Sequence, residues 1–216
     1  MFTLIMENIY KYLVKYDEKW CNIMGFFNPY TDPFDVMFSK KIPMFDRQAF
    51  NMYPKYNFVY DKLWVCQSQN INCGTIESID KFTEINYPIF IKPRWGHLSS
   101  SSKNCFKINS YNELKKYKKL KQMMWSEYIQ GQEYMTDYLM VDGKIIYEIS
   151  YSYSEKQTGY IEVWKYISPK NKSINTVTKW VTKNMSGYTG IVNVQCRNDS
   201  IIEVGFFFRA FCIFFA

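Results

Sequence analysis

The segment YPIFIKP, residues 87–93, decides how the rest of the chain is interpreted. Its apolar run, residues 89–91, is short, continuous and rich in β-branched side chains, which predicts a buried strand. The run ends on Lys92, and Pro93 restricts the backbone directly after it. A lysine held at the end of a buried strand can present its ammonium group to a phosphate as a point charge. Taken alone, the pattern more often marks a solvent-facing lysine at a strand exit.

A polar loop and a basic segment follow this strand. The loop contains Gly96 and a serine run, Ser99–Ser102, whose hydroxyl and backbone N–H groups can surround phosphate oxygens. After a predicted strand over residues 105–108, Ser110 and Glu113 form a capping box that predicts a helix over residues 111–121. Residues 92–121 hold nine Lys and Arg side chains and one acid, a local charge of +8 in a chain of net charge +7. A triphosphate fits this local field best.

Two further segments place polar residues between predicted strands. Residues 127–133 read EYIQGQE and separate a strand that begins at residue 123 from one over residues 133–141. Asp142-Gly143 predicts a tight hairpin turn into a strand over residues 144–153. A closing hairpin, residues 190–204, places Gln195 opposite Glu203. Oxygen donors on adjacent strands suit Mg²⁺, although ordinary polar positions on a hairpin have the same pattern.

The order of the predicted elements indicates the fold class. Helices are expected over residues 1–20, 60–69 and 173–185, and a further strand over residues 160–167. These elements alternate with antiparallel hairpins and not with a repeating strand–helix–strand unit. We therefore predict an α+β fold.

Composition narrows the function classes. The 216 residues are 47% hydrophobic and 19% aromatic, which excludes a disordered chain. The single histidine, His97, excludes multi-histidine metal sites and limits histidine-based nucleophilic catalysis to that one residue. Six cysteines without a CxxC pair predict reduced thiols in a cytoplasmic protein. No apolar run reaches the ~18 residues of a membrane span, and the aromatic stretch over residues 206–216 is too short for one.

The order of these features resembles the ATP-grasp superfamily, and most closely its carbamoyl-phosphate-synthetase and carboxylate–amine-ligase branch. The similar residues are the lysine strand, the serine loop, the EYIQGQE segment and the NVQ…IEV hairpin, within residues 60–205. The resemblance implies two α+β subdomains whose antiparallel sheets grip a nucleotide. We expect a reduced N-terminal region over residues 1–59, a lid subdomain over 60–131 and a truncated C-terminal subdomain over 132–216.

The resemblance also implies cofactors and residue roles. ATP and Mg²⁺, or Mn²⁺ in its place, are the expected cofactors. Lys92 and Glu203 are the expected catalytic residues, and Gln195 and Glu203 the expected metal ligands. Glu133 is expected to accept hydrogen bonds from the ribose hydroxyls. The whole expected nucleotide-binding set is Lys62, Lys92, Ser101, Ser102, Glu127, Tyr128, Ile129 and Glu133.

Three functions stay open. The first is an ATP-dependent ligase that joins a small carboxylate to an amine, or less often a thiol, through an acyl phosphate. The second is a nucleotide-binding module without turnover, because Gly205 stands where the family has a further asparagine ligand. The third is a binder of nucleic acid or an anionic surface through the basic segment Lys115–Lys121, for which a solvated helix face is the more ordinary explanation. Nucleic acid is thus an unlikely partner, and a homodimer is compatible with the sequence.

Overall fold

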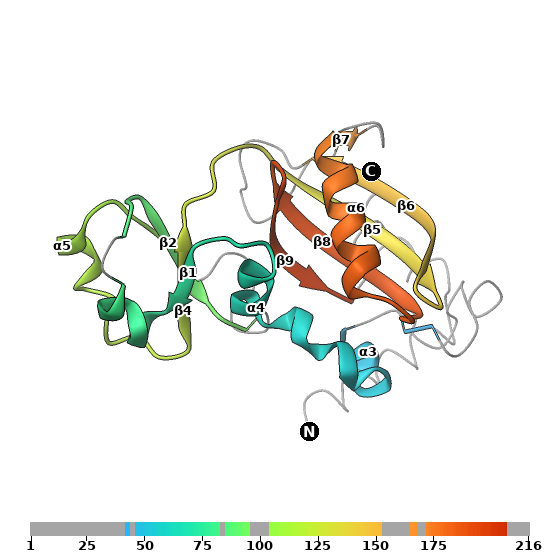
Figure 1. The fold of residues 1–216 in the computed structure, drawn as a ribbon, viewed down its shortest axis with the longest axis horizontal. Helices are drawn as coiled ribbons and strands as arrows, with labels where there is room; N and C mark the ends of the chain where they lie inside the picture. Colours follow the sequence, from blue (N-terminus) through green and yellow to red (C-terminus); the bar gives the residue numbers. More distant parts are fainter. Residues whose placement is uncertain are drawn as a thin grey trace, which may run out of the picture. The chain divides into compact units, whose positions relative to one another are not determined.

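The computed structural model describes residues 42–43, 46–82, 85–95, 104–152, 165–167 and 172–206 (Figure 1). With the exception of residue 42, these belong to one compact unit that spans Pro43–Ala210. The predicted helix over residues 1–20, the serine run and the aromatic stretch after residue 206 lie outside the described residues.

Two antiparallel sheets organise the described part of the chain, as the α+β prediction requires. One sheet has four strands in the order β1-β4-β2-β3, and the other has five in the order β7-β6-β5-β8-β9. The first comprises β1 (Cys73–Thr75), β2 (Ile89–Pro93), β3 (Phe106–Ile108) and β4 (Met123–Glu127). The second comprises β5 (Glu133–Val141), β6 (Lys144–Ser152), β7 (Lys165–Ile167), β8 (Gly190–Arg197) and β9 (Ser200–Gly205).

The helices are short apart from one. They are α3 (Asp46–Met52), α4 (Lys62–Gln67), α5 (Tyr111–Leu114) and α6 (Lys172–Asn184), with 3₁₀ turns η1 (Pro54–Tyr60) and η2 (Ile76–Lys81). The sequence did not predict α3, β1 or the 3₁₀ turns, because such short elements leave no periodic apolar pattern.

The predicted helix over residues 111–121 is wrong in length. Its N-cap forms, since the Ser110 hydroxyl accepts a hydrogen bond from the Glu113 N–H at 3.3 Å, and the Glu113 carboxylate accepts the N–H of Asn109, one residue before the cap, at 2.8 Å. However, α5 ends at Leu114, and the chain continues in turns. The lysines that follow are spaced three and four residues apart, where like charges on a helix repel one another.

The larger core lies between α6 and one face of the five-stranded sheet. The helix contributes Ile174, Val177 and Val181, which share one face at helical spacing and are all fully buried. The sheet contributes alternate residues of its central strands, namely Tyr134, Tyr138 and Met140 on β5 and Val192, Val194 and Cys196 on β8. Figure 1 shows α6 lying across these strands.

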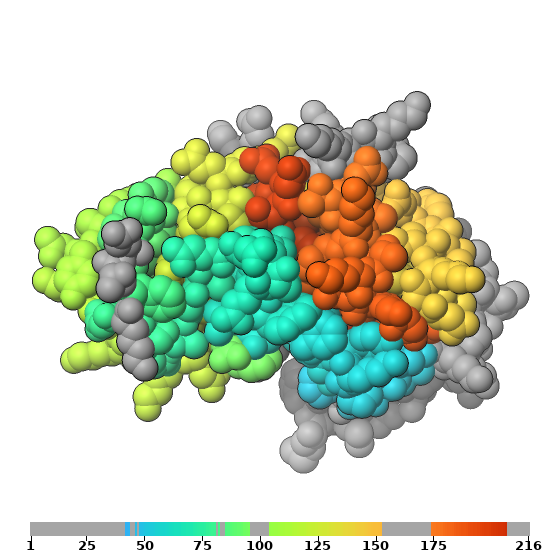
Figure 2. All heavy atoms as spheres, viewed as in Figure 1, coloured from blue at the N-terminus to red at the C-terminus, as the bar shows by residue number. Residues whose placement is uncertain are grey.

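The segment from η1 to α4 packs beside α6 and against the last strand. Trp64 contacts Trp180 edge to face, with ring centroids 6.0 Å apart, and the Trp180 indole N–H donates to the Ser68 hydroxyl at 2.9 Å. Gln69 exchanges two hydrogen bonds with the Ile201 backbone, one at 2.9 Å to its carbonyl oxygen and one at 2.7 Å from its N–H. In Figure 2 the atoms coloured for the segment from η1 to α4 lie beside those of α6. The C-terminal end of α4 is therefore held close to β9.

A second core supports the four-stranded sheet, and a smaller one joins that sheet to α4. The first contains the buried residues Ile76, Ile79, Ile89, Ile91, Ile108, Leu114, Met123 and Trp125. The second contains Leu63, Cys66, Ile71, Cys73 and Met124. The predicted division of the chain after residues 59 and 131 stays a prediction. None of the described helices combines the length and apolar character that a bilayer crossing requires.

Candidate functional site

An ion pair fixes the start of α4 against the end of β2. The Arg94 guanidinium donates to both oxygens of Asp61, with Nε 2.8 Å from Oδ1 and Nη2 2.5 Å from Oδ2. Asp61 is also the N-cap of α4, because its carboxylate accepts the Leu63 N–H at 3.1 Å. The Lys62 N–H in turn donates to the Arg94 carbonyl oxygen at 3.0 Å. These contacts set Lys62 beside the strand that carries Lys92.

The two predicted lysines converge on neighbouring residues of β9. The Lys92 ammonium donates to the Ile202 carbonyl oxygen at 2.8 Å, and the Lys62 ammonium lies 3.2 Å from Glu203 Oε1. Both lysines are almost inaccessible to solvent, with 7% of Lys92 and 2% of Lys62 exposed. The structure thus brings together three residues that the sequence singled out separately.

Burial dominates the electrostatics of Lys62. Removal from water lowers its pKa, and the nearby Lys92 ammonium lowers it further, whereas the Glu203 carboxylate opposes both effects. The Lys62 ammonium pairs with the Glu203 carboxylate, whereas the Lys92 ammonium donates to a neutral backbone carbonyl, so these contacts leave an excess of positive charge at a buried place. A bound polyanion would compensate this excess, which is what a phosphate chain offers.

The predicted metal ligands lie on adjacent strands of the same sheet. Gln195 on β8 and Glu203 on β9 are register partners, as the sequence predicted. The Glu203 side chain is 39% exposed, so its carboxylate is accessible although Lys62 contacts one oxygen. Among the described residues, no group of three or more His, Cys, Asp and Glu side chains is close enough to hold a metal ion. Two hard oxygen donors fit Mg²⁺ that also binds phosphates and water, and they do not fit a fully protein-coordinated cation.

Glu133 has protein partners on both of its oxygens. Arg197 donates to Oε2 from Nη2 at 3.0 Å and from Nε at 3.3 Å, and the Gln195 amide donates to Oε1. The Glu133 side chain is 9% exposed and that of Arg197 is 29% exposed. Since a carboxylate has about four lone-pair positions, these three contacts leave about one for a ligand. One of the two hydrogen bonds expected from a ribose diol fits that remaining position, and the predicted contact of Glu133 with the ribose stays a prediction.

A buried polar network lies on the same face of the sheet. The Asp137 carboxylate accepts hydrogen bonds from the Asn193 amide and the Tyr151 hydroxyl, each at 2.5 Å. All three residues are buried, and Asp137 and Asn193 are register partners on β5 and β8. Sequence reasoning assigned no role to any of them. Glu133 and Asp137 lie four residues apart on β5, but apolar Met135 stands between them on the same face and polar Thr136 stands on the other, so the sequence shows no clear alternation.

The predicted adenine segment, residues 127–129, begins with the last residue of β4. Glu127 is exposed, and its Oε1 accepts the Asn72 N–H at 3.4 Å. The Tyr128 ring lies under the Lys107 ammonium, 4.2 Å from its centroid. Ile129 packs on the small core that joins α4 to the four-stranded sheet. Ser101 and Ser102 lie outside the described residues, so their predicted phosphate contacts stay predictions.

Cys105 is a neighbour of the lysine pair that the sequence did not indicate. Burial raises the pKa of its thiol, the ammonium groups of Lys62 and Lys92 oppose that rise, and Glu203 adds to it. The thiol of Cys105 therefore lies within electrostatic range of Lys62, Lys92 and Glu203. A cysteine next to the mostly polar loop carried no distinctive signal.

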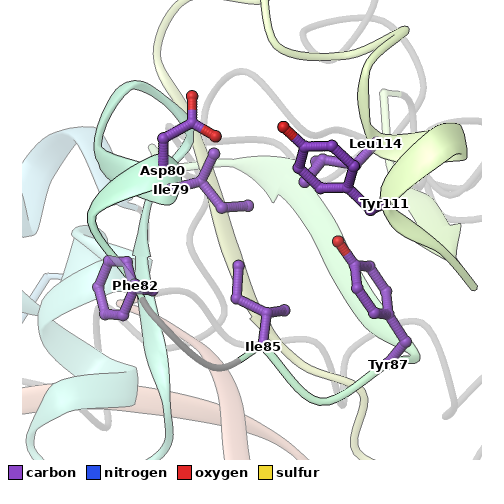
Figure 3. A pocket seen from close by; sticks show the side chains of 7 residues that line it. All are labelled: Ile79, Asp80, Phe82, Ile85, Tyr87, Tyr111 and Leu114. Atoms are coloured by element: carbon purple, nitrogen blue, oxygen red, sulfur yellow. The ribbon is translucent and has the colours of Figure 1, made fainter.

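The side chains of the basic segment, Lys115–Lys121, have other partners than the cluster of Lys62, Lys92 and Glu203. Lys118 pairs with Asp80 and donates to the Tyr111 hydroxyl at 3.1 Å, and Lys115 donates to Asn112 at 3.2 Å. Tyr111 also borders a pocket of about 320 Å³ (Figure 3). Its other lining residues are Ile79, Asp80, Phe82, Ile85, Tyr87 and Leu114, none of which the sequence had assigned a functional role.

Comparisons with known proteins give a fold but no close relative. No family model matches the sequence, and no curated protein matches it either. Among solved structures, the chain is similar to an L-amino acid ligase from Bacillus licheniformis, with a TM-score of 0.55 and 15% identity. That similarity covers 77% of this chain and 46% of the ligase. The chain has the ATP-grasp fold.

Two nucleotide complexes with the same ATP-grasp fold are similar to it at comparable levels. N5-carboxyaminoimidazole synthetase from Staphylococcus aureus, complexed with ADP, has a TM-score of 0.53 and 15% identity over 70% of this chain and 46% of its own. Biotin carboxylase from Campylobacter jejuni, in a β,γ-ATP complex, has a TM-score of 0.54 and 15% identity over 71% of this chain and 41% of its own. This sequence therefore spans less than half the length of each of these three proteins.

Proposed function

We propose that this protein binds ATP with Mg²⁺ and uses them to join a small carboxylate to an amine or, less often, a thiol. The observation that carries the proposal is the convergence of buried Lys62 and Lys92 on the strand that bears Glu203. ATP with its Mg²⁺ supplies the phosphoryl group that activates the carboxylate as an acyl phosphate. The similarity to ATP-grasp structures that contain ADP or an ATP analogue supports the nucleotide part of the proposal.

Each residue of the site has a role in this proposal. Lys62 and Lys92 hold the phosphate chain and neutralise its charge, which positions the terminal phosphate. Glu203 and Gln195 provide oxygen donors for the cation. The segment of Glu127, Tyr128 and Ile129 binds the base, and Ser101 and Ser102 contribute to phosphate binding. Glu133 lies at the sugar.

The binding step is tested with Mg²⁺ and the non-hydrolysable analogue AMP-PNP. We expect titration calorimetry to detect binding by the wild type and at least a tenfold loss for Lys92→Met, because a hydrogen bond to a charged group contributes about 1.5–3 kcal/mol. Methionine retains most of the buried volume, so the fold should persist. The matched control is Lys179→Met, an exposed lysine on α6. Absence of binding by the wild type, or equal binding by both variants, would contradict the proposal.

Nucleotide binding without turnover is the second candidate. Gly205 favours this candidate. It is buried, it is the register partner of Asn193, and it supplies no side-chain ligand two residues after Glu203. The measurement is ADP and phosphate release by the wild type over a broad panel of carboxylates with amines or thiols. Release that depends on one such pair supports the ligase, whereas binding without release by any pair supports the module.

We also propose a cytoplasmic location and small-molecule partners. The four cysteines among the described residues, Cys66, Cys73, Cys105 and Cys196, are free thiols, which fits a reducing compartment. Proteins of the reducing cytoplasm have ready access to ATP. We do not propose nucleic acid as a partner. In the basic segment, Lys118 pairs with Asp80 and Lys115 donates to Asn112.

A further inference from the structure

Glu133, Arg197 and Gln195 form a continuous chain of contacts on one face of the five-stranded sheet. Glu133 on β5 is the register partner of Arg197 on β8, and Gln195 lies two residues earlier on that strand. Two Arg197 N–H groups hold one carboxylate oxygen, and the Gln195 amide contacts the other. The carboxylate is nearly buried, so these contacts are strong and persistent.

This chain determines which end of the Gln195 amide faces Glu133. An ionised carboxylate can only accept hydrogen bonds, so the amide must turn its NH₂ group toward Glu133. The amide is planar, with its oxygen on the side away from its nitrogen. Strand β8 lies between β5 and β9, and Glu203 is the register partner of Gln195 on β9. The orientation set by Glu133 therefore leaves Oε1, the only atom of the amide that can bind a cation, free of that contact and available toward Glu203.

We propose that Glu133 and Arg197 are positioning residues for the cation site, which they control through the amide of Gln195. The inference rests on the proposed function and goes beyond it in the role of Glu133, which acts more on the metal ligand than on the sugar. Arg197 keeps the Glu133 carboxylate oriented, and Glu133 keeps the oxygen of Gln195 available to Mg²⁺.

The test measures the Mg²⁺ concentration that half-saturates AMP-PNP binding. In Glu133→Gln the neutral side chain can itself donate, so the Gln195 amide loses its single orientation. We expect the half-saturating Mg²⁺ concentration to rise about tenfold. Gln195→Ala should raise it by a similar factor, and Glu133→Gln should add less than twofold in the Gln195→Ala background, because both changes remove the same contact.

Three controls separate positioning from a general loss of structure. Glu148→Gln replaces a carboxylate on β6 that contacts the α6 hydroxyl of Thr178, so it should leave the Mg²⁺ dependence unchanged. Arg197→Lys keeps the positive charge beside Glu133 and should change the Mg²⁺ midpoint less than twofold, whereas Arg197→Ala should raise it about threefold. Thermal melts of every variant show that it is folded, and 2′-deoxy and 3′-deoxy ATP measure the contribution of sugar hydroxyls directly.

Failure of the positioning role and failure of the proposed function give different experimental results. If the wild type binds no AMP-PNP at any Mg²⁺ concentration, both proposals fall. If it binds and the effects of Glu133→Gln and Gln195→Ala on the Mg²⁺ midpoint simply multiply, the positioning role is wrong and the nucleotide site stands. The positioning role is equally wrong if Glu133→Gln changes only the discrimination between ATP and its deoxy analogues.

Discussion

The two faces of the five-stranded sheet use the same strands for different purposes. On β5, Tyr134, Tyr138 and Met140 pack against α6, whereas Glu133 and Asp137 belong to the opposite face. On β8 the same alternation separates Val192, Val194 and Cys196 from Asn193, Gln195 and Arg197. One face is held by apolar burial and the other by hydrogen bonds and ion pairs, so changes on the two faces should have different consequences.

The largest expected effect is a buried charge on the helix-covered face. Val194 is fully buried, so Val194→Asp places an unpaired carboxylate in the core and should lower the free energy of unfolding by about 4 kcal/mol or more. The next residue, Gln195, points to the other face, and Gln195→Ser should cost about 1 kcal/mol. Urea denaturation of both variants measures the contrast. Equal losses would show that the two faces do not differ as described.

A smaller effect is expected where the start of α4 is anchored to the end of β2. Asp61→Ala removes the N-cap of α4 and the partner of Arg94, which should lower the free energy of unfolding by about 1–2 kcal/mol. It should also weaken AMP-PNP binding, since Lys62 begins that helix. Asp61→Asn keeps a capping oxygen and should lose about half as much stability. A stable variant with unaltered nucleotide binding would show that this anchor does not position Lys62.

Lys62 itself should contribute little or negative stability. Its pKa in the folded protein is lowered from the ordinary 10.5, chiefly by burial. Between the two pKa values the unfolded chain binds more protons, so folding becomes more favourable as the pH rises through that window. Lys62→Met should therefore be at least as stable as the wild type at neutral pH, and its advantage should shrink toward pH 10.5. Denaturant titrations at several pH values measure this, and a Lys62→Met variant that is destabilised at pH 7 would contradict it.

The smallest effects are expected for charges that lie on neither face of this sheet. Lys116 and Lys119 are exposed after α5, so Lys116→Gln with Lys119→Gln should change the free energy of unfolding by less than about 0.5 kcal/mol. AMP-PNP affinity should stay the same. Oligonucleotide binding at low salt that the double variant abolishes would revive the basic-segment hypothesis, and its steep decline with added salt would identify it as electrostatic.

Some of these features follow from local rules. Asp142 and Gly143 both adopt positive φ, at 50° and 77°, as the predicted two-residue turn requires, and this turn sets the pairing of β5 with β6. The connection between β8 and β9 alone does not fix the pairing of Gln195 with Glu203, because the register set by Arg197 with Ser200 would place Gln195 opposite Ile202. A shift in the register between Gln195 and Cys196 brings Glu203 opposite Gln195. The turn at Asp142 and Gly143 is thus determined by adjacent residues, whereas the partner of Gln195 also depends on this irregularity.

Other features depend on residues far apart in the chain. Asp61 and Arg94 are separated by 33 positions, and Glu133 and Arg197 by 64. Neither pair has a periodic or compositional signature, and a charged side chain in a sequence does not reveal its partner. The end of α5 at Leu114 was missed for another reason, because lysine is a good helix former singly and a poor one when several share a helix face.

The sequence by itself determined the α+β class, the strand that carries Lys92 and the two hairpins. These follow from the backbone geometry of strands and turns, which acts within a few residues. Only the tertiary structure decided that α6 covers the apolar face, that Lys62 joins Lys92 beside Glu203, and that Arg197 and Gln195 hold Glu133. Such contacts arise when distant segments pack together, and the free energy that selects them comes from the burial of whole surfaces and not from the local residue pattern.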